Sequence, residues 1–80
     1  PNPINPINDV FEIFFNLDQR QNLAVSLISQ TGKEMKQYQL TNVLNQHFIL
    51  PLDATLPQGM YILRLVGENF LQTERILVIK

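Results

Sequence analysis

The fold is decided by residues 53–66, which read DATLPQGMYILRLV, a turn signal followed directly by a strand. Pro57 fixes φ at about −65° and Gly59 can adopt a positive φ without steric cost, so the chain can turn tightly here. After the turn, side chains alternate between two faces, which is the period of a β-strand. One face of this strand carries Tyr61, Leu63 and Leu65. We therefore predict a corner that leads into a strand with one buried face.

Outside the corner, apolar and polar residues alternate in short segments that polar turns separate. The segments that predict strands are residues 10–17, 23–28, 34–40, 48–52 and 71–80. The polar turns are residues 18–22, 29–33 and 67–69, and residues 41–46 form a loop in which a helical turn stays open. Residues 34–40 are the most polar segment and a candidate edge strand. Pro51 lacks an N–H, so its strand should lie at an edge or end there.

Strands at this spacing, separated by turn residues, indicate an all-β sandwich or barrel. A corner that brings a tyrosine into a buried strand favours an immunoglobulin-like Greek-key β-sandwich of six to seven mainly antiparallel strands. We predict that residues 9–80 form this sandwich as a single domain. Residues 1–8 contain three prolines, which exclude a helix, so they are an extended linker end or a first short strand. Ile4 and Ile7 are then able to touch the core.

The composition restricts the classes of function. The 80 residues include no cysteine, so no disulfide stabilises the domain and its core must be apolar and well packed. The net charge is −1 and the six Lys and Arg residues are scattered, which argues against nucleic acid as a partner. No apolar run among these 80 residues approaches the roughly 20 residues that span a bilayer, and we expect no signal peptide within them. Because the sequence opens with Pro1-Asn2-Pro3, we expect a piece cut from a longer protein.

No group of side chains is framed for catalysis or metal binding. His47 is the only histidine and the chain has no cysteine, so a zinc ion would lack a set of ligands. We expect His47 to be a partly exposed strand or loop residue. The spacing of Asp9, Asp18 and Asp53 matches no calcium loop, and Asp53 more simply accepts hydrogen bonds in its own turn. No nucleophile elbow or glycine-rich phosphate loop is present. We therefore expect no cofactor, no metal and no enzymatic activity.

The aromatic residues leave two interpretations open. Tyr38, Tyr61 and the five phenylalanines either line a sugar-binding face or fill the core. We favour core filling for Phe11, Phe15 and Phe48. For Tyr61 we expect a buried ring whose hydroxyl bonds to the corner backbone.

Several landmarks occur in a fixed order along the chain. They are Pro1-Asn2-Pro3, the Gly32-Lys33 turn, the segment Leu56-Pro57-Gln58-Gly59-Met60-Tyr61, and the closing Arg75-Ile76-Leu77-Val78-Ile79-Lys80. In order and spacing they resemble the type A C-terminal sorting domain of the type IX (Por) secretion system, over essentially the whole chain. The chain departs from that pattern in turn details, at Ser29 and at Ile4.

The resemblance implies a non-enzymatic secretion signal that directs a larger cargo protein through the outer-membrane translocon to the cell surface. The domain would fold in the periplasm and be recognised by the translocon and its shuttle protein. A sortase-like peptidase would then remove it, with the cargo kept on the surface or released. The resemblance also implies fold-making roles for the motif residues Pro1, Asn2, Pro3, Gly32, Lys33, Leu56, Gly59 and Tyr61.

We place the recognition signal in the last five residues of the sequence, Ile76, Leu77, Val78, Ile79 and Lys80. They form an apolar strand with no polar tail, which a receptor edge could read as an added strand. The alternative is an ordinary sandwich strand with Leu77 in the core, and both hold if one face packs while the edge or Lys80 is read. An exposed edge strand also predicts possible self-association.

A second functional hypothesis is a fibronectin-like or carbohydrate-binding adhesive module. Such modules have a similar corner before their last strands, although Leu56 to Tyr61 is spaced differently. An exposed aromatic platform would favour this hypothesis over the secretion signal.

Overall fold

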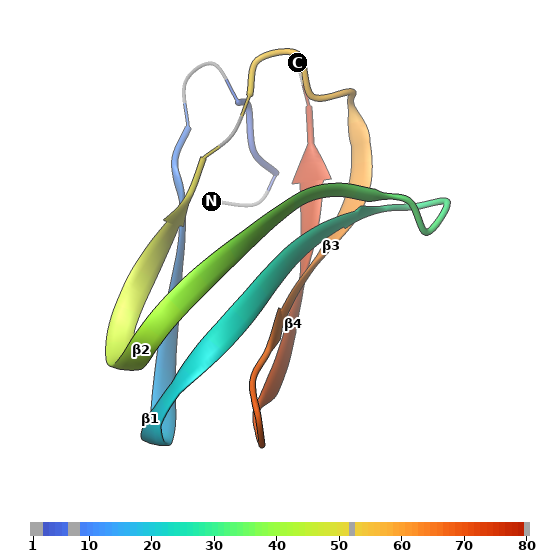
Figure 1. Cartoon of the computed structure of the whole chain (residues 1–80). Helices are drawn as coiled ribbons and strands as arrows, with labels where there is room; N and C mark the ends of the chain where they lie inside the picture. Colours follow the sequence, from blue (N-terminus) through green and yellow to red (C-terminus); the bar gives the residue numbers. More distant parts are fainter. Residues whose placement is uncertain (1–2, 7–8, 52, 80) are drawn as a thin grey trace.

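The protein is an antiparallel sheet whose strands differ greatly in length. The structure, a computed structural model, describes residues 3–6, 9–51 and 53–79. The strands are β1 (Phe11–Ser29), β2 (Glu34–Leu50), β3 (Gly59–Val66) and β4 (Leu71–Val78). They form one four-stranded sheet in the order β2-β1-β3-β4 (Figure 1). The described residues contain no helix, so the all-β, antiparallel prediction is confirmed.

The predicted count of six to seven strands is not what the structure shows. β1 contains two predicted strands and the polar residues 18–22 between them, and β2 likewise runs through residues 41–46. Between the pairs Asn16↔Asn45 and Gln21↔Val43, four residues of β1 lie opposite one residue of β2. The polar residues therefore bulge out of continuous strands instead of ending them. The immunoglobulin-like Greek-key sandwich stays a prediction.

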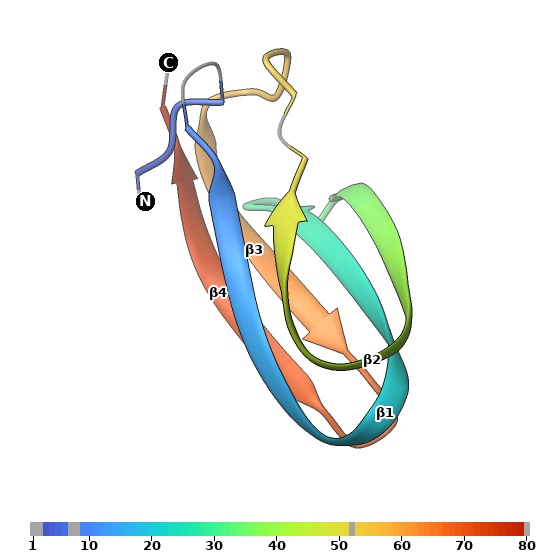
Figure 2. The same ribbon diagram turned by 90° about the vertical axis from the view of Figure 1, so that its left-hand side faces the viewer.

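The bulges bend the paired strands β1 and β2 at the same level. Asn42 adopts a φ of 53°, and its N–H donates to Asn22 Oδ1 over 2.9 Å. Arg20 Nη1 donates to the backbone oxygen of Asn42 over 3.2 Å. Figures 1 and 2 show both strands turning back at this bend. The half of β1 before the bend and the half of β2 after it therefore lie together over the rest of the sheet. One sheet thereby encloses a core between two layers of its own strands.

The core follows the two-residue period of the strands. Its buried side chains in the strands are Ile13, Phe15, Leu17, Leu23, Val25, Leu27, Val43, Leu50, Tyr61, Leu63, Leu65, Ile76 and Val78. Tyr61, Leu63 and Leu65 thus share the buried face that the sequence predicts. Phe11 and Phe48 are partly buried and pack against this core, so the core-filling interpretation is confirmed for them as for Phe15.

The predicted edge strand and the predicted turns at residues 29–33 and 67–69 are confirmed, whereas the predicted turn at residues 18–22 and the predicted loop at residues 41–46 are wrong, because both segments lie within continuous strands. β2 is an edge strand and ends at Leu50, directly before Pro51. Residues 67–69 connect β3 to β4 in a hairpin, in which the N–H of Gly67 donates to the oxygen of Phe70 over 2.8 Å. Leu52 and Ile7 lie outside the described residues.

Candidate functional site

The corner before β3 is built from local hydrogen bonds. Tyr61 is buried, and its hydroxyl donates to the backbone oxygen of Pro57 over 2.5 Å, as the sequence predicts. Burial raises the pKa of Tyr61 above its ordinary value. Asp53 Oδ1 accepts from the N–H of Thr55 over 2.8 Å, which confirms its role within its own turn. Gly59 has a φ of 151°, which favours glycine at this position.

The turn between β1 and β2 lies next to this corner. Gly32 has a φ of 90°, and its N–H donates to the oxygen of Ser29 over 2.9 Å. Ser29 in turn donates its N–H to the oxygen of Lys33 and pairs with Tyr61 across β1 and β3. Turn and corner together line a shallow hollow of about 290 Å³. The structure thus brings together two of the predicted motifs, Gly32-Lys33 and the corner.

The end of β4 belongs to the same end of the sheet. Val78 pairs with Gly59 at the start of β3 and with Ile4 on its other side, where Ile4 forms a parallel bridge. Ile76 and Val78 are fully buried, whereas Ile79 is 41 % exposed. Leu77 is only half-buried, so its predicted place in the core is wrong: Ile76 and Val78 point inward and Leu77 lies on the opposite face.

The remaining predicted site residues are Leu56, Pro3 and three residues that the structure does not describe. Leu56 is buried in the corner and donates its N–H to the oxygen of Asp53 over 2.9 Å. Pro3 is exposed beside Ile4. Pro1, Asn2 and Lys80 lie outside the described residues.

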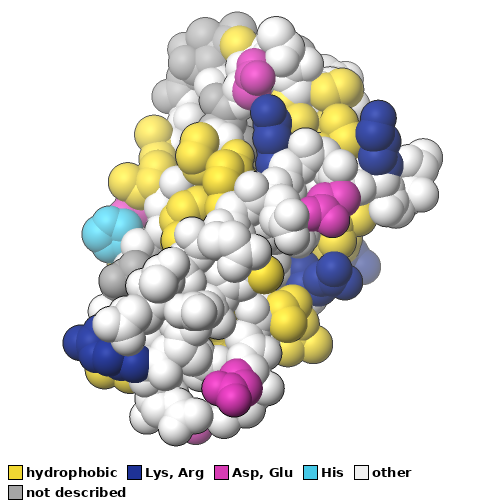
Figure 3. Space-filling view, in the orientation of Figure 1, with side chains coloured by type: hydrophobic (Ala, Val, Ile, Leu, Met, Phe, Trp, Pro, Cys, Tyr) yellow, Lys and Arg dark blue, Asp and Glu magenta, His cyan; other side chains and the backbone are white. Residues whose placement is uncertain are grey.

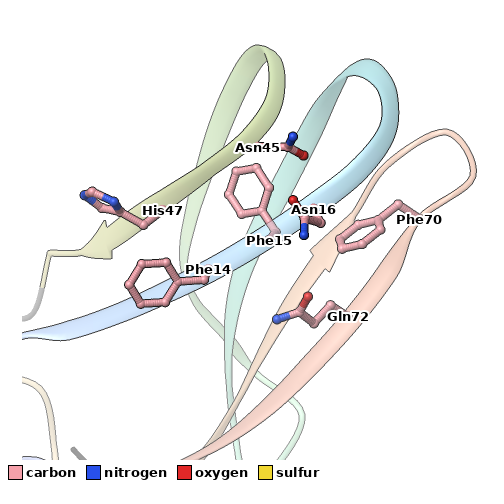
Figure 4. Close-up of a pocket in the computed structure, with 7 residues that line it drawn as sticks. All are labelled: Phe14, Phe15, Asn16, Asn45, His47, Phe70 and Gln72. Atoms are coloured by element: carbon pink, nitrogen blue, oxygen red, sulfur yellow. The ribbon is translucent and has the colours of Figure 1, made fainter.

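A second surface was not predicted from the sequence. It is a hollow of about 550 Å³ lined by Phe14, Phe15, Asn16, Asn45, His47, Phe70 and Gln72. Figure 4 shows that these side chains come from β1, β2, the start of β4 and Phe70, which directly precedes β4. Phe14 is 70 % exposed and meets the His47 ring edge-on at 5.6 Å, and Figure 3 shows hydrophobic side chains beside this histidine. The alternation in residues 10–17 predicts that Phe14 points outward. It does not predict which residues of β2 and β4 lie beside Phe14.

The lining of this hollow is aromatic and amide-bearing, with neither a carboxylate nor a primary amine among its seven residues. His47 is exposed, as predicted, and its Nε2 lies 3.5 Å from Glu12 Oε2. Since both side chains face solvent, this pair contributes little to stability. In the described part of the chain, no three His, Cys, Asp or Glu side chains lie close enough to hold a metal ion.

The aromatic residues do not form one exposed platform. Tyr61 and Phe15 are buried. Tyr38 lies against Phe48 with ring centroids 5.6 Å apart, and its hydroxyl donates to the oxygen of Pro51. Burial and, second, the negative charge of Asp53 raise the pKa of Tyr38. Core and edge packing therefore account for the two tyrosines.

Comparison with protein families gives one result for the whole chain. The family described as "Secretion system C-terminal sorting domain" matches residues 1–80. No curated protein and no solved structure matches the chain. The match does not support the fibronectin-like or carbohydrate-binding alternative. Within the described residues, no helix is long and apolar enough to cross a membrane.

Proposed function

Since the chain belongs to the family of C-terminal sorting domains of type IX secretion, we propose that its signal is read from residues 76–80. The family is that of sorting signals on cargo proteins of this secretion system, which implies contact with the secretion machinery and export to the outer membrane, the cell surface or the medium. Within this role, the segment from Ile76 to Lys80 is the contact surface and the rest of the domain presents it.

The division of side chains along this segment supports the proposal. Ile76 and Val78 are fully buried and anchor the segment, while Ile79 exposes 41 % of its surface beside the corner. A strand held on one face and open on the other can be bound without unfolding the domain. The low fraction of charged residues, 16 %, suits recognition by shape and backbone rather than by electrostatic steering.

The partners proposed for this surface are the outer-membrane translocon and its shuttle protein. The domain would fold in the periplasm during transit, act without enzymatic activity of its own, and be removed by a sortase-like peptidase. The motif residues at the corner and at the Gly32-Lys33 turn would serve the fold that presents the segment. The finer fold assignment, an immunoglobulin-like sandwich over residues 9–80, belongs to the same proposal and is supported by the two layers of the bent sheet.

The experiment is a pair of matched substitutions in the full domain, fused behind a reporter protein in a cell with a type IX system. Ile79→Ser changes the exposed isoleucine of the proposed signal. Ile49→Ser changes an isoleucine on β2 that is 50 % exposed and lies outside the signal. We expect Ile79→Ser to retain the reporter in the periplasm and Ile49→Ser to leave surface delivery unchanged.

Thermal unfolding of both purified variants shows whether each remains folded. Equal surface delivery of the two folded variants would contradict the proposal. This pair is more informative than a deletion of residues 76–80, because that deletion also removes the buried Ile76 and Val78 and destabilises the domain.

A further inference from the structure

The outer edge of β4 is partly covered by a short piece of the same chain. Ile4 donates its N–H to the oxygen of Leu77 over 2.8 Å and accepts from the N–H of Ile79 over 2.9 Å. These two bonds place Ile4 in parallel register with Val78, and its side chain is fully buried. In the part of the chain that the structure describes, Ile4 therefore occupies the position of a fifth strand beside the segment proposed as the signal.

The residues around Ile4 limit how far this pairing can extend. Pro6 stands two residues after Ile4, where the next donor to β4 would lie, and it lacks an N–H, so it cannot donate to the ladder. After Ile4 the chain leaves β4 in a turn, in which Asn5 donates its N–H to Asp9 Oδ2 and Asp9 donates its N–H to the oxygen of Asn5, both over 2.8 Å. Within the described residues, the contact of Ile4 with this edge consists of its buried side chain and these two backbone hydrogen bonds.

We propose that the edge of β4 at Leu77–Ile79 is a strand-exchange site, in which an extended segment of a partner protein replaces Ile4. The partner segment runs parallel to β4, donates to the oxygen of Leu77, accepts from the N–H of Ile79 and buries one β-branched or leucine side chain where Ile4 now lies. This inference rests on the proposed function, since it specifies how the segment 76–80 is read.

We favour exchange, in which the partner segment replaces Ile4, over the addition of a strand beside Ile4. In an exchange, each contact that Ile4 loses with β4 is made again by the partner segment. The backbone groups of Leu77 and Ile79 stay hydrogen-bonded, and the cavity left by Ile4 is filled again. A longer partner segment without a proline two residues after the exchanged position also gains a ladder hydrogen bond to β4 that Pro6 cannot supply. Ile4 then acts as a replaceable cover of the edge, and it protects the edge from pairing with other chains.

The test uses the full chain and a labelled synthetic peptide of residues 1–8 as the probe strand. In the wild-type chain, Ile4 of the chain itself competes with the peptide, so we expect the peptide to bind the wild-type chain weakly. Ile4→Ser removes the competing side chain, and we expect it to bind the peptide at least tenfold more tightly. Ile49→Ser should bind like the wild type. A peptide in which serine replaces its own isoleucine at position 4 should not bind, and chemical-shift changes should centre on Leu77 and Ile79.

Amide hydrogen exchange of the wild-type chain keeps the test independent of how well Ile4→Ser folds. We expect the Ile79 amide to exchange at least tenfold faster than the slowest amides of β3 and β4, because the cover opens without global unfolding. Exchange of Ile79 only at the global rate, or no gain in peptide binding by a folded Ile4→Ser, would overturn the inference. Neither readout involves export, so a failure here is distinguishable from normal delivery of Ile79→Ser, which overturns the proposed function.

Discussion

At its first end β3 begins from a corner with local contacts, whereas at its second end it runs into a turn held by a distant residue. The corner is tied by Tyr61 to Pro57, four residues back in the chain. The turn is tied by Gln21, whose Oε1 accepts from the N–H of Glu68 over 2.8 Å, across 47 positions. The first arrangement forms with little loop closure, while the second forms only when the bend of β1 is in place.

The second end is packed more closely than the first. A Cβ added at Gly67 would lie 2.3 Å from Gln21 Oε1 and 2.7 Å from Leu23 Cδ2, whereas nothing lies within 4 Å of one added at Gly59. Gln21 is buried and also donates Nε2 to the oxygen of Gln19 and to Asn69 Oδ1. One glutamine thus joins the bend of β1 to the β3–β4 hairpin, and with it to the strand that carries the proposed signal.

The largest effect should come from Gly67→Ala. The added methyl group must displace Gln21 from its hydrogen bonds and shift the buried Leu23, so we expect a loss of roughly 2–3 kcal/mol in the free energy of unfolding. Urea denaturation measures this loss. Glu68→Ala is the matched control, because its exposed side chain is removed from the same turn and its N–H stays in place. Similar stability of the two variants would show that the close packing at Gly67 has no energetic consequence.

The next effect is that of Gln21→Ala, which removes the contacts between bend and hairpin without a clash. We expect a loss of about 1–2 kcal/mol, since the freed groups of Glu68 and Asn69 can reach water. Gln19→Ala, in the same stretch of β1 and exposed, should change stability by less than about 0.5 kcal/mol.

A double mutant tests whether the two effects are coupled. In the Gln21→Ala background, Gly67→Ala no longer meets Oε1, so the loss for the pair should be smaller than the sum of the single losses. Additive losses would mean that Gln21 and Gly67 act separately, against the geometry of the turn.

The difference between the two ends also explains which features the sequence could predict. Tyr61 and Pro57 are close in the chain, so turn chemistry and a two-residue period indicate their contact. The contact of Gln21 with Gly67 depends on how β1 bends, and no local pattern records it. The sequence of residues 18–22 predicts a turn because a bulge and a turn use the same polar residues; the pairing with β2 decides between them.

The same limit applies to the candidate site. The period of β4 predicts which of its residues share a face, and the structure agrees for Ile76 and Val78. The pairing of Ile4 with β4 is a single-residue bridge between prolines, which leaves no periodic trace and which proline would disfavour. Aromatic Phe14 is visible in the sequence, but the hollow beside it needs residues from three strands.

At the first end of β3, Tyr61→Phe should have a smaller effect than either change at the second end. It removes one hydrogen bond to the oxygen of Pro57 and keeps the buried ring, so we expect a loss of about 1 kcal/mol in the free energy of unfolding. Tyr38→Phe, which loses a longer bond of 3.2 Å at an exposed site, serves as the control and should lose less. A loss for Tyr61→Phe above that for Gly67→Ala would reverse the ranking of the two ends.

The smallest effect concerns alkaline pH and distinguishes the corner from the turn. The pKa of Tyr61 is raised by burial, so the neutral hydroxyl is favoured in the folded chain and the phenolate in the unfolded one. The contribution of Tyr61 to stability is therefore fully present below the unfolded-state pKa of about 10 and is lost as the pH rises through the folded-state pKa.

The pKa of Tyr38 is raised as well, so both measurements are made in a Tyr38→Phe background. In that background, the stability gap between the chain with Tyr61 and the chain with Tyr61→Phe should be constant well below about pH 10 and should narrow as the pH rises above about 10 toward the raised folded-state pKa. Gln21→Ala carries no titrating group and should show a constant gap over the same range. A constant gap for Tyr61→Phe would mean that Tyr61 ionises equally well in the folded and the unfolded chain, which the buried ring and its hydrogen bond to Pro57 argue against.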